Sequence, residues 1–363
     1  MADRLAAFVS RRVFVRGLGR LTAGAALLRW TACNTTAQSS GTDAAPSGAH
    51  APGACLPFLT PIDGFYRQFG GRTTVDGWSL PDLDASSFEL TLTGLVASEQ
   101  RLRLADFEAD EKHHVSVLKT MICVLGFHST AIWTGVPLRL LLDRAGIDRE
   151  RTVRLRFFGA DGFDNNLRLD DVYDSPDDLF EPLIAFRIYG EPLPRELGFP
   201  FRLLLGDRYG YKNTKWLARI EASDRDEETG QYQARGYPDA GVIEPIPTVE
   251  NLRLTETVPR GPVELCGFAL SGYAGIERVE LSVDGKPFER AMLSSVGALT
   301  ERYPELAASV QLGDPERFGF PPRGVWAAWR FVLETRGGVQ KVRVRVLDRA
   351  GNSAEGTELH ITS

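Results

Sequence analysis

The segment from residue 117 to residue 137 constrains the fold more than any other part of the chain. Its apolar beginning is typical of a buried strand and ends at a cysteine, Cys123. Trp133 follows ten residues later, and the pattern after Pro137 predicts a short amphipathic helix that stops at Gly146. A lone thiol at a strand end, followed by a glycine-containing turn, can offer one soft ligand to a metal that other groups also hold.

The bulk composition is that of an ordinary globular protein. At 363 residues the chain is long enough for two domains, and 43% hydrophobic with 25% charged residues can support a sizeable core. The 36 glycines and 21 prolines favour strands and turns over long helices. A formal net charge of −6 argues against a general nucleic-acid or membrane-surface binder.

The first 33 residues have the layout of a twin-arginine export signal. Arg11 and Arg12 precede a weakly apolar segment, residues 18–28. The chain is therefore expected in the periplasm or another extracytoplasmic compartment. The alternative is that the segment is a basic amphipathic helix that resembles a signal by chance. Arg20 supports this alternative, because it places a charge within the apolar segment.

The four cysteines show no metal-site spacing. Cys33 offers a lipid-anchoring site, which the arginine and tryptophan just upstream disfavour. Residues 34–56 are rich in small and polar residues and predict a disordered tether, because they cannot bury enough apolar surface. A disulfide between Cys55 and Cys266 is an option in an oxidising compartment, but the sequence does not establish it.

Patterning divides the rest of the chain at a polar, Pro- and Gly-containing stretch near residues 221–247. Before it, alternating segments such as residues 88–95 predict strands mixed with short helices. After it, short β segments at turn spacing predict a β-sandwich, with a hairpin turn at Asp284 and Gly285. Residues 295–325 contain proline and glycine throughout and predict a long loop insertion.

Four segments of the chain resemble the molybdopterin-binding core of the sulfite oxidase family of molybdenum enzymes. They are residues 60–67, the segment around Cys123, residues 198–204 and residues 208–216. The resemblance implies an α+β fold with a strand-rich molybdopterin-binding domain at residues 57–245. An immunoglobulin-like β-sandwich follows at residues 246–363, and a homodimer through this domain is a further hypothesis.

The resemblance implies that Cys123 is the protein's ligand to molybdenum, beside the two sulfurs of the pterin dithiolene. Without the resemblance, a lone cysteine in an apolar run is more simply a small buried hydrophobic residue. The resemblance also implies that Arg202 holds the cofactor. A guanidinium matches pterin and phosphate oxygens, and an arginine within an apolar strand would be costly to bury without such a partner.

The loop before Trp216 is the implied binding site for the cofactor phosphate. Its candidates are Asn213, Thr214 and Lys215, with Lys212 as a weaker one, because the loop offers positive charge and free backbone N–H groups. A solvated basic turn is the alternative. Leu197 is a departure, since relatives often have histidine or asparagine there.

Tyr66 and Arg67 are the implied cofactor contacts of the first segment, although the Arg-Asn-His that some relatives carry next is absent. Asp161 is a candidate contact to the pterin or the substrate. The alternative is that it only shapes the turn in which it lies. Phe163 stands where relatives have an active-site tyrosine.

The residues after Cys123 bear on the substrate. Sulfite-oxidising members follow the cysteine with arginines, whereas here Val124 follows, and the first group able to carry positive charge is His128. Arginine forks recognise small oxyanions, so sulfite is disfavoured as a substrate. His128 is a candidate catalytic proton donor, or else an ordinary loop histidine.

The sequence therefore predicts an exported molybdenum-cofactor oxidoreductase that transfers an oxygen atom on a small sulfur-oxo or nitrogen-oxo substrate. A haem-attachment CxxCH motif is absent from the sequence, so electrons are expected to pass to a separate redox protein or subunit. One alternative is an activity like that of methionine sulfoxide reductases. The other is a cofactor-free binding or scaffold module that retains the fold.

Overall fold

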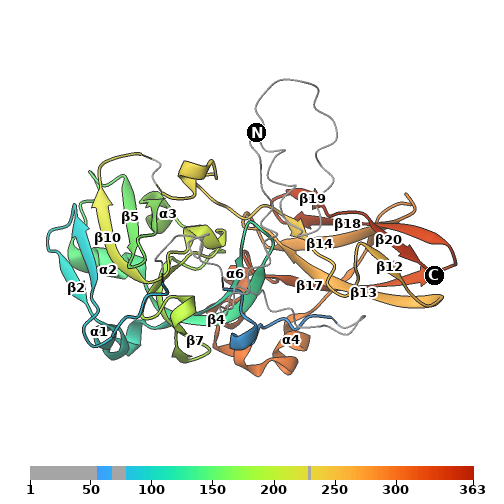
Figure 1. The fold of residues 1–363 in the computed structure, drawn as a ribbon, viewed down its shortest axis with the longest axis horizontal. Coiled ribbons are helices and arrows are strands. Elements are labelled where there is room, and N and C mark those ends of the chain that lie inside the picture. Colours follow the sequence, from blue (N-terminus) through green and yellow to red (C-terminus); the bar gives the residue numbers. More distant parts are fainter. Residues whose placement is uncertain (1–54, 68–78, 228–229) are drawn as a thin grey trace, which may run out of the picture.

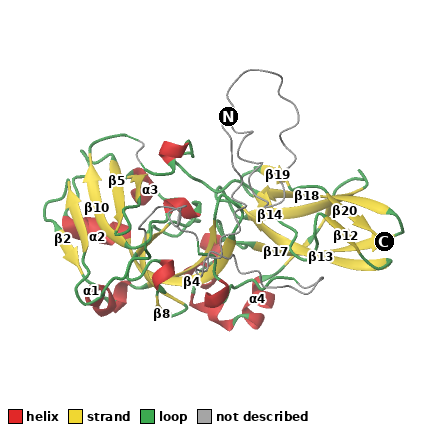
Figure 2. Ribbon diagram, in the orientation of Figure 1, coloured by secondary structure: helices red, strands yellow, loops and turns green. Residues whose placement is uncertain are grey.

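The computed structural model describes residues 55–67, 79–227 and 230–363. An N-terminal part built on two sheets occupies one end of an elongated molecule, and a second part with two more sheets occupies the other, which includes the C terminus (Figure 1). Strands dominate both parts, with short helices around them (Figure 2). The predicted strand-rich α+β fold is confirmed.

The outer sheet of the N-terminal part buries one face in a core that it shares with the helix α2 (Leu138–Ala145). Its strands in spatial order are β2 (Gln100–Leu102), β1 (Leu90–Gly94), β10 (Leu217–Ser223), β5 (Arg154–Gly159) and β6 (Asp164–Arg168). Leu90 and Leu92 are buried and alternate with threonines, as the sequence predicts. Because β10 begins just after Trp216, this sheet fixes the end of the loop that carries Lys215.

The second sheet of the N-terminal part lies next to the C-terminal part. It contains β3 (Val115–Ile122), β4 (His128–Pro137), β7 (Leu183–Ile188) and β8 (Glu191–Pro192), with β9 (Arg202–Leu204) also paired to β7. β3 is an edge strand and pairs only with β4 among the described strands, Ile122 lying opposite His128. The strand ends one residue before Cys123, as predicted.

The helices of the N-terminal part are short. They are α1 (Leu104–Ala109), α2 (Leu138–Ala145) and α3 (Asp170–Tyr173), with 3-10 turns η3 (Ile62–Gly64), η5 (Glu111–His113), η6 (Arg195–Leu197), η7 (Gly210–Lys212) and η8 (Gln233–Arg235). α2 is the helix predicted after Pro137, and it ends at Gly146, whose φ of 65° favours glycine. Leu138, Leu141 and Leu142 of α2 are buried, and Leu140 is partly buried against the same core.

Two sheets stack face to face in the C-terminal part. The first contains β11 (Ile246–Pro247), β13 (Gly261–Leu270), β17 (Ala327–Thr335) and β16 (Met292–Leu293). The second contains β12 (Thr255–Thr257), β20 (Leu359–Thr362), β18 (Val339–Asp348), β14 (Ile276–Val283) and β15 (Glu289–Arg290), with β19 (Ser353–Glu355) beside β18.

The two C-terminal sheets share one core, to which Leu265, Leu281 and Val344 contribute. The predicted hairpin turn is present, with positive φ angles of 52° at Asp284 and 74° at Gly285. Two stacked sheets agree with the predicted sandwich, whereas a specific kinship with immunoglobulin domains stays a prediction, as do the predicted domain boundaries.

The predicted insertion lies between β16 and β17, and it contains short helices that the sequence pattern did not indicate. It forms α4 (Val296–Arg302), η9 (Pro304–Ala308), α5 (Val310–Gly313) and α6 (Pro315–Phe318). Its buried Leu299 and Leu306 join a core that also contains Leu118 of β3 and Ile132 of β4. That core gives the insertion the apolar contacts that stabilise its short helices.

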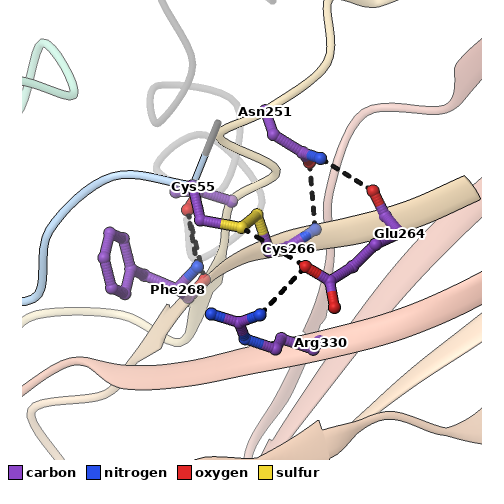
Figure 3. Close-up of a disulfide and its surroundings, with 7 residues drawn as sticks. Cys55, Asn251, Glu264, Cys266, Phe268 and Arg330 are labelled. Carbon is purple, nitrogen blue, oxygen red and sulfur yellow. Dashed lines mark hydrogen bonds and ion pairs between the residues drawn. A yellow bond between two sulfur atoms is a disulfide. The ribbon is translucent and has the colours of Figure 1, made fainter. Parts of the chain in front are cut away.

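A disulfide joins the first described residue, Cys55, to Cys266 of β13 across 211 residues, with their Cα atoms 6.0 Å apart (Figure 3). Beside it, the side chain of Asn251 accepts from the backbone N–H of Cys266 at 2.9 Å. The segment after Cys55 then runs between the two parts, and Thr60 N–H donates to the carbonyl oxygen of Thr130 at 2.8 Å. The disulfide therefore ties this segment to the C-terminal part.

The predicted export signal, the Cys33 lipidation site and all but the end of the predicted tether lie outside the described residues. Within the described part of the chain, no helix combines the length and the apolar character that crossing a membrane requires.

The disulfide generates a stability prediction. Replacing Cys55 and Cys266 together by serine should lower the free energy of unfolding by about 2–4 kcal/mol, because the bond closes a long loop in the unfolded chain. Denaturant unfolding of the variant and the wild type measures the difference. Reductant should bring the wild type to the stability of the variant and leave the variant unchanged; equal stabilities without reductant would contradict the prediction.

Candidate functional site

A tight turn fixes the position of Cys123. Its backbone N–H donates to the carbonyl oxygen of Phe127 at 2.7 Å, and its own carbonyl oxygen accepts from Gly126 N–H at 2.8 Å. Gly126 has a φ of 87°, which a glycine adopts without strain. The Cys123 thiol is free and partly buried. Burial raises its pKa, while the backbone N–H groups of Val124 and Leu125 act in the opposite direction.

The Cys123 side chain lies in the wall of a pocket that encloses about 750 Å³, including the space at its open mouth. Segments from across the N-terminal part contribute to this wall. The lining residues are Phe65, Tyr66, Met121, Cys123, Val124, Asp161, Phe163, Leu197, Arg202, Gly210, Tyr211, Asn213, Lys215, Trp216 and Tyr232. Six predicted site residues, from Tyr66 to Lys215, are therefore brought together in one cavity.

Arg202 is buried in β9, and only 4% of its surface is exposed. Its two terminal nitrogens donate to the carbonyl oxygens of Leu197 and Asn213, at 3.0 and 3.4 Å. Its guanidinium also lies 4.8 Å from the centre of the Trp133 ring. Burial lowers the pKa of Arg202 to about 10, so it remains charged at neutral pH. β9 thus carries a positive charge into an apolar region, as the sequence predicts.

Lys215 lies in the same wall as Arg202. Its ammonium group donates to the carbonyl oxygen of Glu196 at 2.9 Å and sits 4.4 Å from the centre of the Trp216 ring. Burial and the nearby Arg202 lower the pKa of Lys215 well below its ordinary value. Trp216 has a φ of 48°, a left-handed conformation that turns the chain sharply after Lys215.

Gly198 permits this approach of two cationic side chains. It has a φ of 110°, and a Cβ atom at this position would lie 3.1 Å from the Cβ of Lys215 and 3.2 Å from that of Arg202. Arg202 lies close enough to Lys215 to lower the pKa of this lysine, so negative charge in the pocket would favour the protonated form of Lys215. The pocket therefore has the electrostatics of an anion-binding site.

Orphaned polar atoms test whether this pocket fits a phosphate-bearing cofactor. Within the described part of the chain, Arg202 Nε, Arg67 Nε and Thr214 Oγ1 are buried and have no hydrogen-bond partner. Of the three residues, only Arg202 lines the pocket, and an unpaired buried donor is costly, so Arg202 Nε indicates a missing acceptor. The chemistry of a pterin phosphate, with several acceptor oxygens and negative charge, fits this set.

Tyr66 lies in the pocket wall opposite the loop that contains Gly210. Its backbone N–H donates to Ser129 Oγ at 3.0 Å, and a Cβ atom at Gly210 would lie 2.7 Å from the Tyr66 hydroxyl. Burial, and then the nearby Cys123, raise the pKa of Tyr66 above its ordinary value. Tyr66 therefore presents a protonated phenol to the pocket.

Arg67 follows Tyr66 but is not part of the pocket wall; its terminal nitrogens donate to the carbonyl oxygens of Ile62 and Asp63. Thr214 is buried between two wall residues.

Asp161 and Asn213 line the pocket but use their side chains to shape it. Asp161 Oδ1 accepts from Phe163 N–H at 3.0 Å. Asn213 Oδ1 accepts from Leu205 N–H at 2.7 Å, and its Nδ2 donates to the carbonyl oxygen of Tyr209 at 2.9 Å. The Asn213 amide thus holds the loop in place.

The structure does not place Lys212 on the pocket wall. Its ammonium group donates to the carbonyl oxygen of Asn166 at 2.5 Å and lies 3.5 Å from Asp239. Burial lowers the pKa of Lys212 to about 8, an effect that Asp239 offsets in part. The 3-10 turn Gly210–Lys212 directs this side chain into a buried polar cluster, so the structure does not bring Lys212 together with the other predicted phosphate-binding residues.

His128 is also outside the pocket wall. It is paired with Ile122 in the β3–β4 ladder, so both side chains lie on the face of the sheet that packs against the C-terminal part. Its ring lies edge-on to Trp326, with ring centres 4.9 Å apart, and near Phe268. Sheet register therefore explains why His128 is not where the prediction of a catalytic proton donor requires it.

Sequence reasoning missed Tyr232, which lines the pocket from the stretch predicted as a linker. Its ring stacks on Tyr211, with centres 4.9 Å apart and planes 12° from parallel, and meets Phe163 edge-on at 6.2 Å. Burial, and then Cys123, raise the pKa of Tyr232 to about 12. A tyrosine in a polar, glycine-containing stretch gives no sequence signal for this position.

The pocket thus combines a soft ligand, an anion-binding region and an aromatic wall with two phenols. A metal held by Cys123 would face this wall, and a charged cofactor tail could be held by Arg202 and Lys215. The described residues contain no cluster of three or more His, Cys, Asp and Glu residues able to hold a metal alone. A metal here would therefore need ligands from a cofactor.

Comparisons with known proteins agree with this reading of the pocket. Residues 77–232 match the family described as the oxidoreductase molybdopterin binding domain. Sulfite oxidase of Arabidopsis thaliana is 25% identical over 297 residues, which are 66% of this chain and 72% of that protein. Mitochondrial sulfite oxidase of Rattus norvegicus is 27% identical over 248 residues, 57% of this chain and 45% of that protein.

The chain thus spans less than half the length of the rat protein. The structure of the sulfane dehydrogenase SoxCD from Paracoccus pantotrophus matches with a TM-score of 0.64 and 19% identity, over 83% of this chain and 75% of that chain, which shows a common fold. Residues 77–232 thus match an oxidoreductase molybdopterin binding domain, and the chain is similar to sulfite oxidases in sequence and to SoxCD in fold.

Proposed function

We propose that this protein is an exported molybdenum enzyme that transfers an oxygen atom to or from a small, neutral sulfur-oxo or nitrogen-oxo substrate. The observation that carries the proposal is the free thiol of Cys123 in the wall of the pocket that also contains Arg202 and Lys215. When bound, the molybdenum cofactor supplies a metal that changes oxidation state as an oxygen atom is exchanged with the substrate.

Cys123 holds the metal in this proposal. Its thiol is partly buried and has a raised pKa, so it is a poor free nucleophile but becomes a thiolate when a metal displaces its proton. The hydrogen bonds of the turn at Phe127 and Gly126 fix its direction. These contacts position the sulfur before the cofactor arrives.

Arg202 and Lys215 hold the charged tail of the cofactor. Both cationic groups already bind carbonyl oxygens, and these contacts fix the position of the groups without neutralising their charge. Thr214 Oγ1, next to Lys215 in the sequence, is a buried hydroxyl that lacks a partner within the described residues. Asp161 and Asn213 support the same wall through the turns that they stabilise.

The substrate side of the pocket favours an uncharged molecule. The wall near Cys123 includes Val124, Phe163 and Tyr232, and none of these side chains carries a positive charge for a small oxyanion. Tyr232 keeps its proton at neutral pH, since its pKa is about 12, and its hydroxyl can donate a hydrogen bond to a substrate oxygen. A sulfoxide or N-oxide fits these properties better than sulfite.

Export and the redox partner remain parts of the proposal that rest on sequence. The paired Arg11 and Arg12 support export by the twin-arginine route, and the disulfide of Cys55 with Cys266 suits an oxidising compartment. Electrons would pass to or from a separate redox protein. Homodimerisation through the C-terminal part stays a hypothesis.

The metal ligand can be tested by changing Cys123 to alanine in protein made by a host that supplies the cofactor. The variant should lose the visible absorption of a metal–thiolate centre together with bound molybdenum and activity, because a methyl group cannot coordinate a metal. Absorption spectra and metal analysis measure this. The matched control, Cys33→Ser, should keep all three properties, and a Cys123→Ala variant that retains metal and activity would refute the assignment.

The anion-binding assignment can be tested with two lysines of one loop. Lys215→Met should weaken pterin retention roughly 10–100-fold, because a charge-assisted hydrogen bond is worth about 1.5–3 kcal/mol. Lys212→Met is the control: it should lower stability by removing a partner of Asp239, yet retain the pterin. Pterin fluorescence after gel filtration measures retention, and equal losses in both variants would contradict the assignment.

The substrate class can be tested on the loaded enzyme with artificial electron donors and acceptors. We expect kcat/KM for neutral sulfoxides and N-oxides to exceed that for sulfite, since the wall near Cys123 offers aromatic contacts and hydroxyl donors. Sulfite as the preferred substrate would contradict the proposal, because the wall near Cys123 offers no cationic side chain to recognise an oxyanion.

A further inference from the structure

The open edge of β3 contacts the helical insertion that follows β16. β3 pairs with β4 on one side, and on the other its main chain would lack partners in a buried region. Leu118, near the middle of β3, is only 1% exposed. Its backbone N–H and carbonyl groups therefore need partners from outside the sheet.

The side chain of Gln311 provides both partners. Gln311 Oε1 accepts from Leu118 N–H at 3.0 Å, and Gln311 Nε2 donates to the carbonyl oxygen of Leu118 at 2.7 Å. A glutamine amide carries the same donor and acceptor as a peptide group, so it takes the place of one residue of an additional strand. Gln311 is itself only 2% exposed, and it belongs to α5 of the insertion.

A second contact holds the same edge two residues further along. Trp326 N–H donates to Thr120 Oγ1 at 3.1 Å, and this oxygen is also 2.8 Å from Thr130 Oγ1 of β4. The two contacts bracket the part of β3 that leads to Met121 and Cys123, which line the pocket. The C-terminal half of the chain therefore fixes the strand on which the metal ligand depends.

We propose that Gln311 is a positioning residue, which sets the location of Cys123 by holding the free edge of β3. This goes beyond the proposed function, because it concerns the strand geometry whether or not the cofactor is bound. Without the two hydrogen bonds, the middle of β3 is free to separate from the insertion, and a displacement there reaches the turn that begins at Cys123. Small displacements of reacting groups are costly to catalysis.

The test compares Gln311→Met with Gln340→Met in a Cys33→Ser background. Methionine keeps the volume of glutamine but loses both hydrogen bonds. Gln340 is a matched control: it is also buried and bonds to the backbone of Arg336 and Glu334, but its partners lie away from β3. Gln311→Met loses two side-chain hydrogen bonds to β3, whereas Gln340→Met loses two within the C-terminal part.

Two measurements on cofactor-free protein report the position of β3. Amide hydrogen exchange over residues 115–122 should be at least about tenfold faster in Gln311→Met, because these groups open locally. Alkylation of Cys123 should also be several-fold faster. Gln340→Met should leave both rates at the wild-type values. In the loaded enzyme, Gln311→Met should lower kcat by about tenfold while KM changes less.

A third variant keeps the inference testable if Gln311→Met does not fold. Gln311→Glu has the shape of glutamine, and when protonated its carboxyl group can accept from Leu118 N–H and donate to the Leu118 carbonyl oxygen. It should therefore protect β3 below the pKa of the introduced carboxyl and lose that protection above it. Wild-type exchange and alkylation rates in Gln311→Met, or equal increases in both methionine variants, would overturn the inference.

Discussion

The rest of the site depends on the burial of two positive charges beside one another. Arg202 and Lys215 come from different segments, and burial depresses the pKa of both. Keeping them together requires Gly198 to leave room and Trp216 to take a left-handed backbone conformation. Such an arrangement costs stability in the protein alone. The burial of Arg202 and Lys215 becomes favourable when a ligand brings negative charge. The conformation of the segments that carry them is therefore consistent with an anionic ligand.

The pocket lies in the N-terminal part, but its scaffold is shared with the C-terminal part. β3 carries Cys123 at its end, and residues of the insertion bind its free edge. The segment that carries Tyr66 begins at a disulfide to β13 and contacts β4 on its way to the pocket. β3 and the segment of Tyr66, which lie next to Cys123, therefore each contact both the N-terminal and the C-terminal part. This explains how a second part without pocket-wall residues can still influence the chemistry.

Local patterns in the sequence were sufficient to predict the strand that ends at Cys123, the helix after Pro137 and the cationic strand residue Arg202, because each depends on its immediate neighbours. The sequence could not show where the side chains of His128 and Lys212 lie, because the direction of a side chain depends on tertiary structure. Sheet register turns His128 toward Trp326, and a buried carboxylate, Asp239, attracts Lys212. The helices of the insertion were not predicted, because they are stabilised by a core that only the assembled chain provides.

Tyr232 shows most clearly how tertiary structure completes a site that sequence outlines. It comes from a polar stretch, yet it stacks on Tyr211 and faces the same pocket as Cys123. Its neighbour Gln233 donates to Asp239, the carboxylate that also binds Lys212 and Arg154. Lys212, which does not reach the anion-binding region, thus helps through Asp239 to hold the segment that carries Tyr232 to the pocket. In the proposed function, Arg202 and Lys215 bind an anion, whereas Lys212 and Arg154 pair with Asp239 and so help to fix the segment of Tyr232.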